Sequence, residues 1–203
     1  HVRMYAESGG TWTQVGDDID GEAANDWSGG SRTSVSISSD GTRVAIGAYF
    51  NGGNAGHVRV YAESDGTWTQ VGSDINGKAA YEWFGISVSM SSDGTRVAIG
   101  APGGNSNKVR VYAESGGTWV QMGADIVGEG SSPFFGGSVS MSSDGTRVAI
   151  GAPENGNAVG CVQVYCFQEL TSCDMSRFPP TDGGVGDCPR TLAIGSTCQP
   201  TCE

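Results

Sequence analysis

The sequence predicts an all-β protein built from β-propeller-like blades of four antiparallel strands, with a small disulfide-rich segment at its C-terminal end. The stretch Phe84–Pro102 returns almost letter for letter as Phe135–Pro153, and a looser copy runs from Ser34 to Ala48. Four tyrosines recur at spacings of 56, 51 and 53 residues: Tyr5, Tyr61, Tyr112 and Tyr165. A period of about fifty residues with about four short strands per copy is typical of a propeller, whereas a two-sheet sandwich needs no such repetition.

The first two strands of each copy form a predicted β-hairpin. Runs of β-branched and apolar residues flank an Asp-Gly pair, which suits a tight type I′ turn. The turn pairs are Asp40-Gly41, Asp93-Gly94 and Asp144-Gly145. Within Arg96–Gly100, Val97 and Ile99 oppose Ala98 and Gly100. One face of this strand is therefore bulky and the other nearly bare, so we expect another sheet to lie close against the bare face.

A second hairpin follows each first one. Val58–Ser64 turns through Asp65-Gly66 into Thr67–Val71, and its copies are Val2–Val15 and Val109–Met122. Each copy carries one tryptophan, and together with the four tyrosines these large side chains are predicted to pack between blades. The tryptophans are Trp12, Trp68 and Trp119.

The repeat region is predicted to span residues 1–165, with three repeats of 51–56 residues at approximately 1–56, 57–107 and 108–160. Residues 1–16 supply the last two strands of a blade, 27–72 and 83–123 supply two whole blades, and 134–167 supply three strands. Joining the two ends would close a ring of three blades, whereas propellers typically use about four to eight. We therefore expect either a longer propeller or copies that complete one another head to tail, and a head-to-tail contact that does not close gives a filament.

The motif Phe84-Gly followed by Gly-Ala-Pro102, repeated as Phe135-Gly and Gly-Ala-Pro153, resembles the FG-GAP repeat of integrin α-type propellers. The first copy departs from it, with Trp27-Ser-Gly-Gly and with Ala48-Tyr49 in place of Ala-Pro. The resemblance implies that the Ser-Val-Ser-Met strand is the innermost of its blade. Many relatives bind calcium in the loop of the first hairpin, but Ser-Ser-Asp-Gly-Thr is too short and too poor in oxygen ligands for such a site. We expect no metal and no other cofactor.

All six cysteines follow residue 160: Cys161, Cys166, Cys173, Cys188, Cys198 and Cys202. An even number in a short Gly/Pro-rich segment predicts a disulfide framework over residues 166–203, although the sequence does not choose the pairing. Such a framework predicts an oxidising, extracellular setting. The stretches Pro180–Cys188 and Leu192–Glu203 resemble a cysteine-rich module of large microalgal cell-surface proteins, which implies a cell-surface location and further protein beyond Glu203.

Composition excludes several functions. The net charge is −11 and the chain has two lysines, so a nucleic-acid partner is not expected. No apolar run is long enough to predict a membrane span. His1 and His57 occupy equivalent repeat positions, which favours a structural role over general-base catalysis. We found no catalytic constellation and expect no enzymatic activity.

Two functions fit these observations. The first is an extracellular structural or adhesive protein that self-associates head to tail into a filament or surface coat. The alternative is a ligand-binding propeller of a larger receptor or lectin-like protein, with glycans or extracellular proteins as partners. Incomplete blades favour the first function. Near-identity of the copies argues against a single dedicated binding site, although repeated sugar pockets would be compatible with it.

Overall fold

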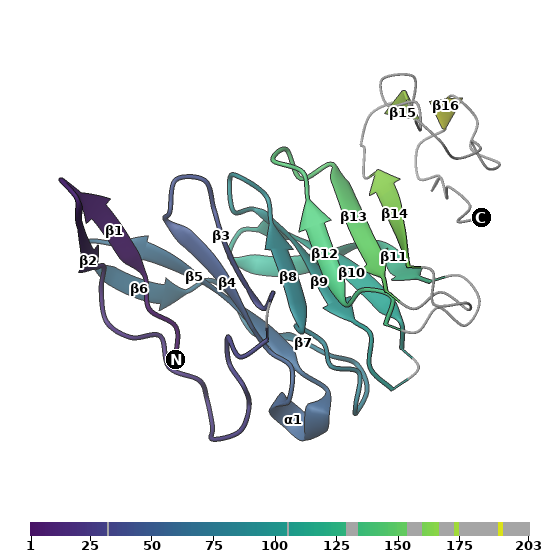
Figure 1. Ribbon diagram of the computed structural model, residues 1–203, viewed down its shortest axis with the longest axis horizontal. Coiled ribbons are helices and arrows are strands. Elements are labelled where there is room, and N and C mark those ends of the chain that lie inside the picture. The colour runs from purple at the N-terminus through teal and green to yellow at the C-terminus, as the bar shows by residue number, and fades with distance from the viewer. Residues whose placement is uncertain are drawn as a thin grey trace.

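The computed structural model describes residues 1–31, 33–104, 106–128, 134–153 and 160–166, together with the backbone of 173–174 and 191–192. The chain is all-β (Figure 1). Its strands are β1 (Tyr5–Ser8), β2 (Thr11–Gln14), β3 (Val35–Ile37), β4 (Arg43–Ala48), β5 (His57–Ser64), β6 (Thr67–Gln70), β7 (Ile75–Asn76), β8 (Ser87–Met90), β9 (Arg96–Ala101), β10 (Lys108–Ser115), β11 (Thr118–Val127), β12 (Ser138–Met141), β13 (Arg147–Ala152), β14 (Cys161–Cys166), β15 (Cys173–Asp174) and β16 (Thr191–Leu192).

Helix is confined, in the described part of the chain, to the short turn α1 (Asn51–Asn54), which contains two glycines in left-handed conformation. No helix among the described residues is long and apolar enough to cross a membrane.

The strands form antiparallel sheets that follow one another in chain order across Figure 1. An N-terminal hairpin, β1–β2, comes first. The first sheet has the order β3-β4-β5-β6, with β7 also pairing with β5. The second sheet is β8-β9-β10-β11, and the third is β12-β13-β14. The strands therefore group as a half unit, two full units and a three-stranded unit, as the sequence predicts. We call the face of each sheet that points toward the next sheet its front face, and the opposite one its back face.

Three apolar layers hold these units together. Val44 and Ile46 on the back of the first sheet pack with Ile19 and the N-terminal hairpin. The front of the first sheet packs against the back of the second through residues that include Val58, Val60, Val97 and Ile99. The front of the second sheet packs against the back of the third through residues that include Val109, Val111, Val148 and Ile150. Adjacent units are thus joined by the same kind of apolar layer three times.

The bare face of the second strand allows very close approach, as expected. A Cβ atom added to Gly47 would collide with the carbonyl oxygen of Gly85 in the next sheet. One added to Gly100 would collide with the carbonyl oxygen of Gly136. Glycine is required at these two positions because backbone, which cannot move aside, fills the space of a side chain.

The predicted type I′ geometry of the first hairpin is wrong. In a type I′ turn both central residues have positive φ, but of Asp40 and Gly41 only the glycine does, at 75°. The Gly41 amide donates to the Ser38 carbonyl at 3.0 Å, which closes the turn one residue earlier. Asp40 is held in place by its side chain, which accepts hydrogen bonds from the Ser38 hydroxyl at 2.6 Å and the Thr42 amide at 3.0 Å. The hairpin loop therefore contains an Asx-turn, in which the Asp40 side chain accepts from the amide two residues later, and Gly41 within it has a left-handed conformation.

The same geometry recurs at Asp93-Gly94 and Asp144-Gly145. Doubly left-handed turns occur instead in the second hairpin, where Asp65 and Gly66 have φ of 52° and 78°.

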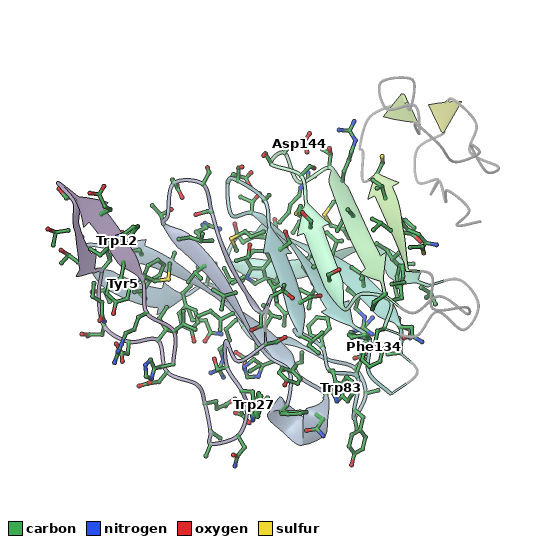
Figure 2. All side chains as sticks on the ribbon, viewed as in Figure 1. Tyr5, Trp12, Trp27, Trp83, Phe134 and Asp144 are labelled. Carbon is green, nitrogen blue, oxygen red and sulfur yellow. The ribbon has the colours of Figure 1, made fainter. Side chains whose placement is uncertain are left out.

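The repeated aromatic residues do not all pack alike. Tyr112 and Tyr165 are buried, while Tyr61, Trp68 and Trp119 are partly buried against the apolar layers. Tyr5 and Trp12 are instead 50% and 68% exposed (Figure 2). The prediction that these two pack between sheets is wrong for the described residues, because no sheet lies behind the N-terminal hairpin.

A substitution at Gly100 tests the close approach. We expect Gly100→Ala to lower the free energy of unfolding by about 1–3 kcal/mol in urea titrations, because the methyl group overpacks the contact with Gly136. Gly151→Ala is the matched control, since the equivalent glycine of the third sheet faces only Ser138 of its own sheet. Equal destabilisation by both changes would contradict the role of the inter-sheet contact.

The turn aspartates should contribute to acid stability. Hydrogen bonds from the Ser142 hydroxyl and the Thr146 amide lower the pKa of Asp144 to about 2. A carboxylate whose pKa is lower in the folded state stabilises the protein above its unfolded pKa of about 4, and this contribution disappears as pH falls through the folded value. We expect the melting-temperature difference between wild type and Asp144→Asn to be constant above about pH 5 and to vanish near pH 2. A difference independent of pH across this window would refute this account.

Candidate functional site: the uncovered faces of the sheets

The same polar interactions recur at the contact between the first and second sheets and at the contact between the second and third sheets. Across the first, the Met90 amide donates to the Ser36 hydroxyl at 3.0 Å. Across the second, the Met141 amide donates to the Ser89 hydroxyl at 2.9 Å. The serines that face the next sheet are therefore hydrogen-bond acceptors for its innermost strand.

Two further hydrogen bonds between neighbouring units also recur, one donated by a tryptophan of the fourth strand and one donated by an arginine beside the turn of the first hairpin. Trp68 Nε1 donates to the Val15 carbonyl and Trp119 Nε1 donates to the Val71 carbonyl, both at 2.9 Å. At the turns, Arg43 donates to the Gly94 carbonyl at 3.3 Å and Arg96 donates to the Gly145 carbonyl at 3.2 Å. Each sheet thus binds the next through the same set of donors and acceptors.

The front face of the third sheet carries the same residue pattern as the front faces of the first and second sheets. Among the described residues, however, no further sheet packs against it. Val162 occupies the position of Val58 and Val109, which are 0% exposed, yet it is 62% exposed. Ser140 occupies the position of Ser36 and Ser89 and is exposed. The third sheet therefore presents, toward its front, a surface that the first and second sheets bury.

The opposite end of the stack is uncovered as well. The N-terminal hairpin lies behind only the outer part of the first sheet, so Val35 and Ile37 of β3 are 40% and 48% exposed. Tyr5 and Trp12 project from the hairpin itself at the far edge of the molecule (Figure 2). The two ends thus offer complementary halves of the repeated contact.

A groove of about 910 Å³ lies at the loop end of the third sheet. Thr33 and Tyr49 from the first sheet region, Ile86 from the second, and Phe134 and Val162 from the third line it. It also contains the small residues Gly30, Ser31, Gly137, Ser138, Gly151, Ala152, Pro153, Gly160 and Cys161. Its size falls within the range of small-molecule sites.

Ion pairs recur in the N-terminal half unit and in the two full units, whereas the three-stranded unit has Gln163 at the arginine position. Arg3 pairs with Asp18, Arg59 with Asp74 and Arg110 with Asp125, at 2.8, 2.8 and 3.0 Å. The side chains of these arginines are 46%, 17% and 0% exposed, respectively, so the pair becomes more deeply buried along the chain. Arg110 is also bound by Glu82, whose side chain is 2% exposed.

These contacts set the charge states. Burial raises the pKa of Glu82, but hydrogen bonds from Arg110 and from the Lys78 amide outweigh it and hold the pKa below its usual range. The hydrogen bonds from Arg59 lower the pKa of Asp74 to about 2. The whole network is therefore ionised at neutral pH.

Glu22, His57 and Asp74 form a cluster with metal-ligand chemistry, since their ligand atoms lie within 4.8 Å of one another. Burial, followed by the charge of Arg59, lowers the pKa of His57 and keeps its ring neutral. However, Arg59 lies 2.8 Å from Asp74 and 3.0 Å from Glu22, so both carboxylates already form ion pairs with its guanidinium. At the repeat position of His57 in the second sheet stands Lys108, 3.7 Å from Asp125. We therefore assign this cluster to ion pairing, because a metal would have to displace a guanidinium.

Cys161 and Cys166 lie at the two ends of β14, and within the described residues neither forms a disulfide. The side chains of Cys173, Cys188, Cys198 and Cys202 lie outside the described residues. The disulfide framework accordingly stays a prediction.

Sequence reasoning identified the repeated hairpins but missed the ion-pair network. Its signal was present, because Arg3, Arg59 and Arg110 recur in the repeated strand and an Asp-Ile pair follows each outer strand. The pairing itself depends on β7 and the end of β11 returning to β5 and β10.

No protein-family model and no curated protein matches the chain. Among solved structures, a proposed 6-phosphogluconolactonase from Bacteroides uniformis matches 82% of the chain with 14% identity and a TM-score of 0.49, over 40% of its own length. TolB from Acinetobacter baumannii matches 78% of the chain with 17% identity and a TM-score of 0.45, over 33% of its length. The chain spans less than half of the length of these two proteins. At these scores the likeness carries no argument about activity.

Substituting Arg110 tests how strongly the buried ion pairs contribute to the free energy of unfolding. We expect Arg110→Met to lower the free energy of unfolding by about 3–5 kcal/mol, because Glu82 is left buried without its partner. Arg3→Met removes the same pair where it is solvent-exposed and should cost less than about 1 kcal/mol. Urea denaturation of both variants measures the contrast, and similar losses would show that burial does not govern this pair.

Proposed function

We propose that the chain is an extracellular, non-enzymatic structural module whose sheets are blades of an incomplete β-propeller, and that copies associate head to tail. The uncovered front face of the third sheet carries this proposal. Burying a valine side chain contributes roughly 1.5–3 kcal/mol, so a surface that repeats the internal contact favours a partner of the same kind.

The N-terminal hairpin of a second copy supplies such a partner. In the second sheet, Tyr112 and Trp119 pack against the front of the first sheet, which includes Val58 and Val60. Tyr5 and Trp12 are their equivalents and are exposed. Docking of these rings over Val162 and Val164 reproduces the internal contact between chains.

This contact joins two different surfaces, so each added copy presents a new free face. Such a heterologous contact extends into a fibre unless its rotation closes a ring. Within the described residues, β1 and β14 each pair with a single neighbouring strand, and the other edge of each strand favours strand addition.

A ligand-binding propeller is the second candidate, and the groove of about 910 Å³ favours it. In that case the uncovered sheet face belongs to a longer propeller and the loops present the site. The two functions differ in what the isolated chain does at high concentration.

Single-end variants test the assembly. We expect wild-type protein to form extended chains by analytical ultracentrifugation and negative-stain imaging, whereas Val162→Lys and Trp12→Ser each remain monomeric. Because each variant blocks only one end, mixing them should give dimers and no longer chains. This outcome is specific to a head-to-tail contact.

Val127→Lys is the matched control. Val127 is 50% exposed and points away from the face of β11 that buries Ile126. It should assemble as wild type does. If wild-type protein stays monomeric at every protein concentration tested, the assembly proposal is wrong.

A further inference from the structure

Three aromatic residues occupy one repeat position in a strained backbone conformation. Trp27, Trp83 and Phe134 precede the first strand of each sheet and have φ of 55°, 55° and 61°. Bulky side chains are genuine outliers in this region, and glycine or asparagine would be less costly there. An aromatic ring is therefore retained at this position against a conformational cost, which points to a use for the ring.

In the second sheet this ring packs on a glycine. A Cβ atom at Gly103 would lie 2.6 Å from ring atoms of Trp83, so the indole needs a glycine beneath it. The Trp83 ring is consequently half-buried.

The first copy breaks this arrangement. Where the second copy has Pro102-Gly103, the first has Tyr49-Phe50. Because Phe50 occupies the place of this glycine, the Trp27 ring cannot pack on the backbone there as the Trp83 ring does, and Trp27 is 53% exposed. Its ring centroid lies 6.1 Å from that of Tyr49 and 5.5 Å from that of Phe50. This departure from the repeat creates a three-ring cluster in which Trp27 is exposed and Tyr49 and Phe50 are partly buried.

The cluster continues into the groove. Tyr49 lines the groove, and the hydroxyl-bearing residues Ser31 and Thr33 lie along it. Phe134 lines its far side and packs near Trp83, with ring centroids 6.3 Å apart. Trp27, Trp83 and Phe134 follow one another along the lower edge of the molecule, far from the turn that carries Asp144 (Figure 2).

The neighbouring carboxylates are already paired. Asp26 accepts from the Ala23 amide and from Asn51, both at 3.0 Å. Glu22 lies 3.0 Å from Arg59. Both carboxylates therefore already have partners within the protein, and the net charge of −11 disfavours a polyanion as ligand.

From this arrangement we infer that the Trp27–Tyr49–Phe50 cluster and the adjoining groove bind the sugar rings of a neutral polysaccharide. The negative face of an aromatic ring attracts the C–H groups of a pyranose face, while hydroxyl side chains along the groove satisfy the sugar hydroxyls. No proton, electron or covalent bond is transferred. A coat-forming protein would gain attachment to a cell-wall or matrix polymer by this site, and the inference does not depend on self-association.

The test uses the full chain and a panel of soluble oligomers: the hexasaccharides cellohexaose, laminarihexaose and mannohexaose as neutral probes, with oligoalginate as an anionic probe and the peptide hexalysine as a cationic one. Titration calorimetry should detect binding of at least one neutral probe. Trp27→Asn should weaken that binding about tenfold, because it removes the most exposed ring. Asparagine tolerates the left-handed backbone, so the fold is kept.

Two further variants complete the design. Tyr49→Pro combined with Phe50→Gly restores the sequence of the second copy and should weaken binding at least as much as Trp27→Asn does, because it removes the other two rings. Trp12→Asn removes an exposed tryptophan at the other end of the molecule and should leave affinity unchanged. Failure of every neutral probe to bind, binding only of a charged probe, or equal affinity in all variants would each overturn the inference. Oligomeric state measured on the same samples reports on the assembly proposal separately.

Discussion

The structure depends on the distance between neighbouring sheets, and two glycines set that distance. The carbonyl oxygens of Gly85 and Gly136 occupy the space that a side chain would fill at Gly47 and Gly100. Only at this separation can the Met90 and Met141 amides reach the serine hydroxyls of the preceding sheet. Short, exposed strands of this kind are marginal by themselves, so the stability of each sheet comes from its neighbours.

Buried charge follows from the same stacking. In the N-terminal half unit and the two full units, an arginine binds the aspartate that returns from its own outer strand, and of these three arginines only Arg110 is fully buried. Glu82, from the loop that precedes the second sheet, completes its shell. In the first sheet the equivalent acid, Asp26, binds Asn51 instead, and Glu22 approaches Arg59. Loops that differ between copies therefore decide how the shared ion pair is solvated.

Much of the fold could be predicted from the sequence, because repetition identifies equivalent positions. The grouping of strands and the bulky and bare faces of Arg96–Gly100 followed from periodicity alone. The turn at Asp40-Gly41 was misassigned because the sequence does not reveal that Ser38 and Thr42 hold the aspartate side chain. The exposure of Tyr5 and Trp12 was also missed, since a repeat position predicts burial only when the neighbouring unit is present. The aromatic cluster was not predicted, because the sequence does not show that the side chains of Trp27 and Phe50 lie against each other in the folded chain.

The graded burial of the three arginine pairs gives the molecule a mechanical polarity. If the two ends are pulled apart, each unit loses its own arginine–aspartate pair more readily where water already reaches that pair. The Arg3 pair is the most hydrated and the Arg110 pair the least. Under load, the N-terminal hairpin would peel away first while the second sheet still holds.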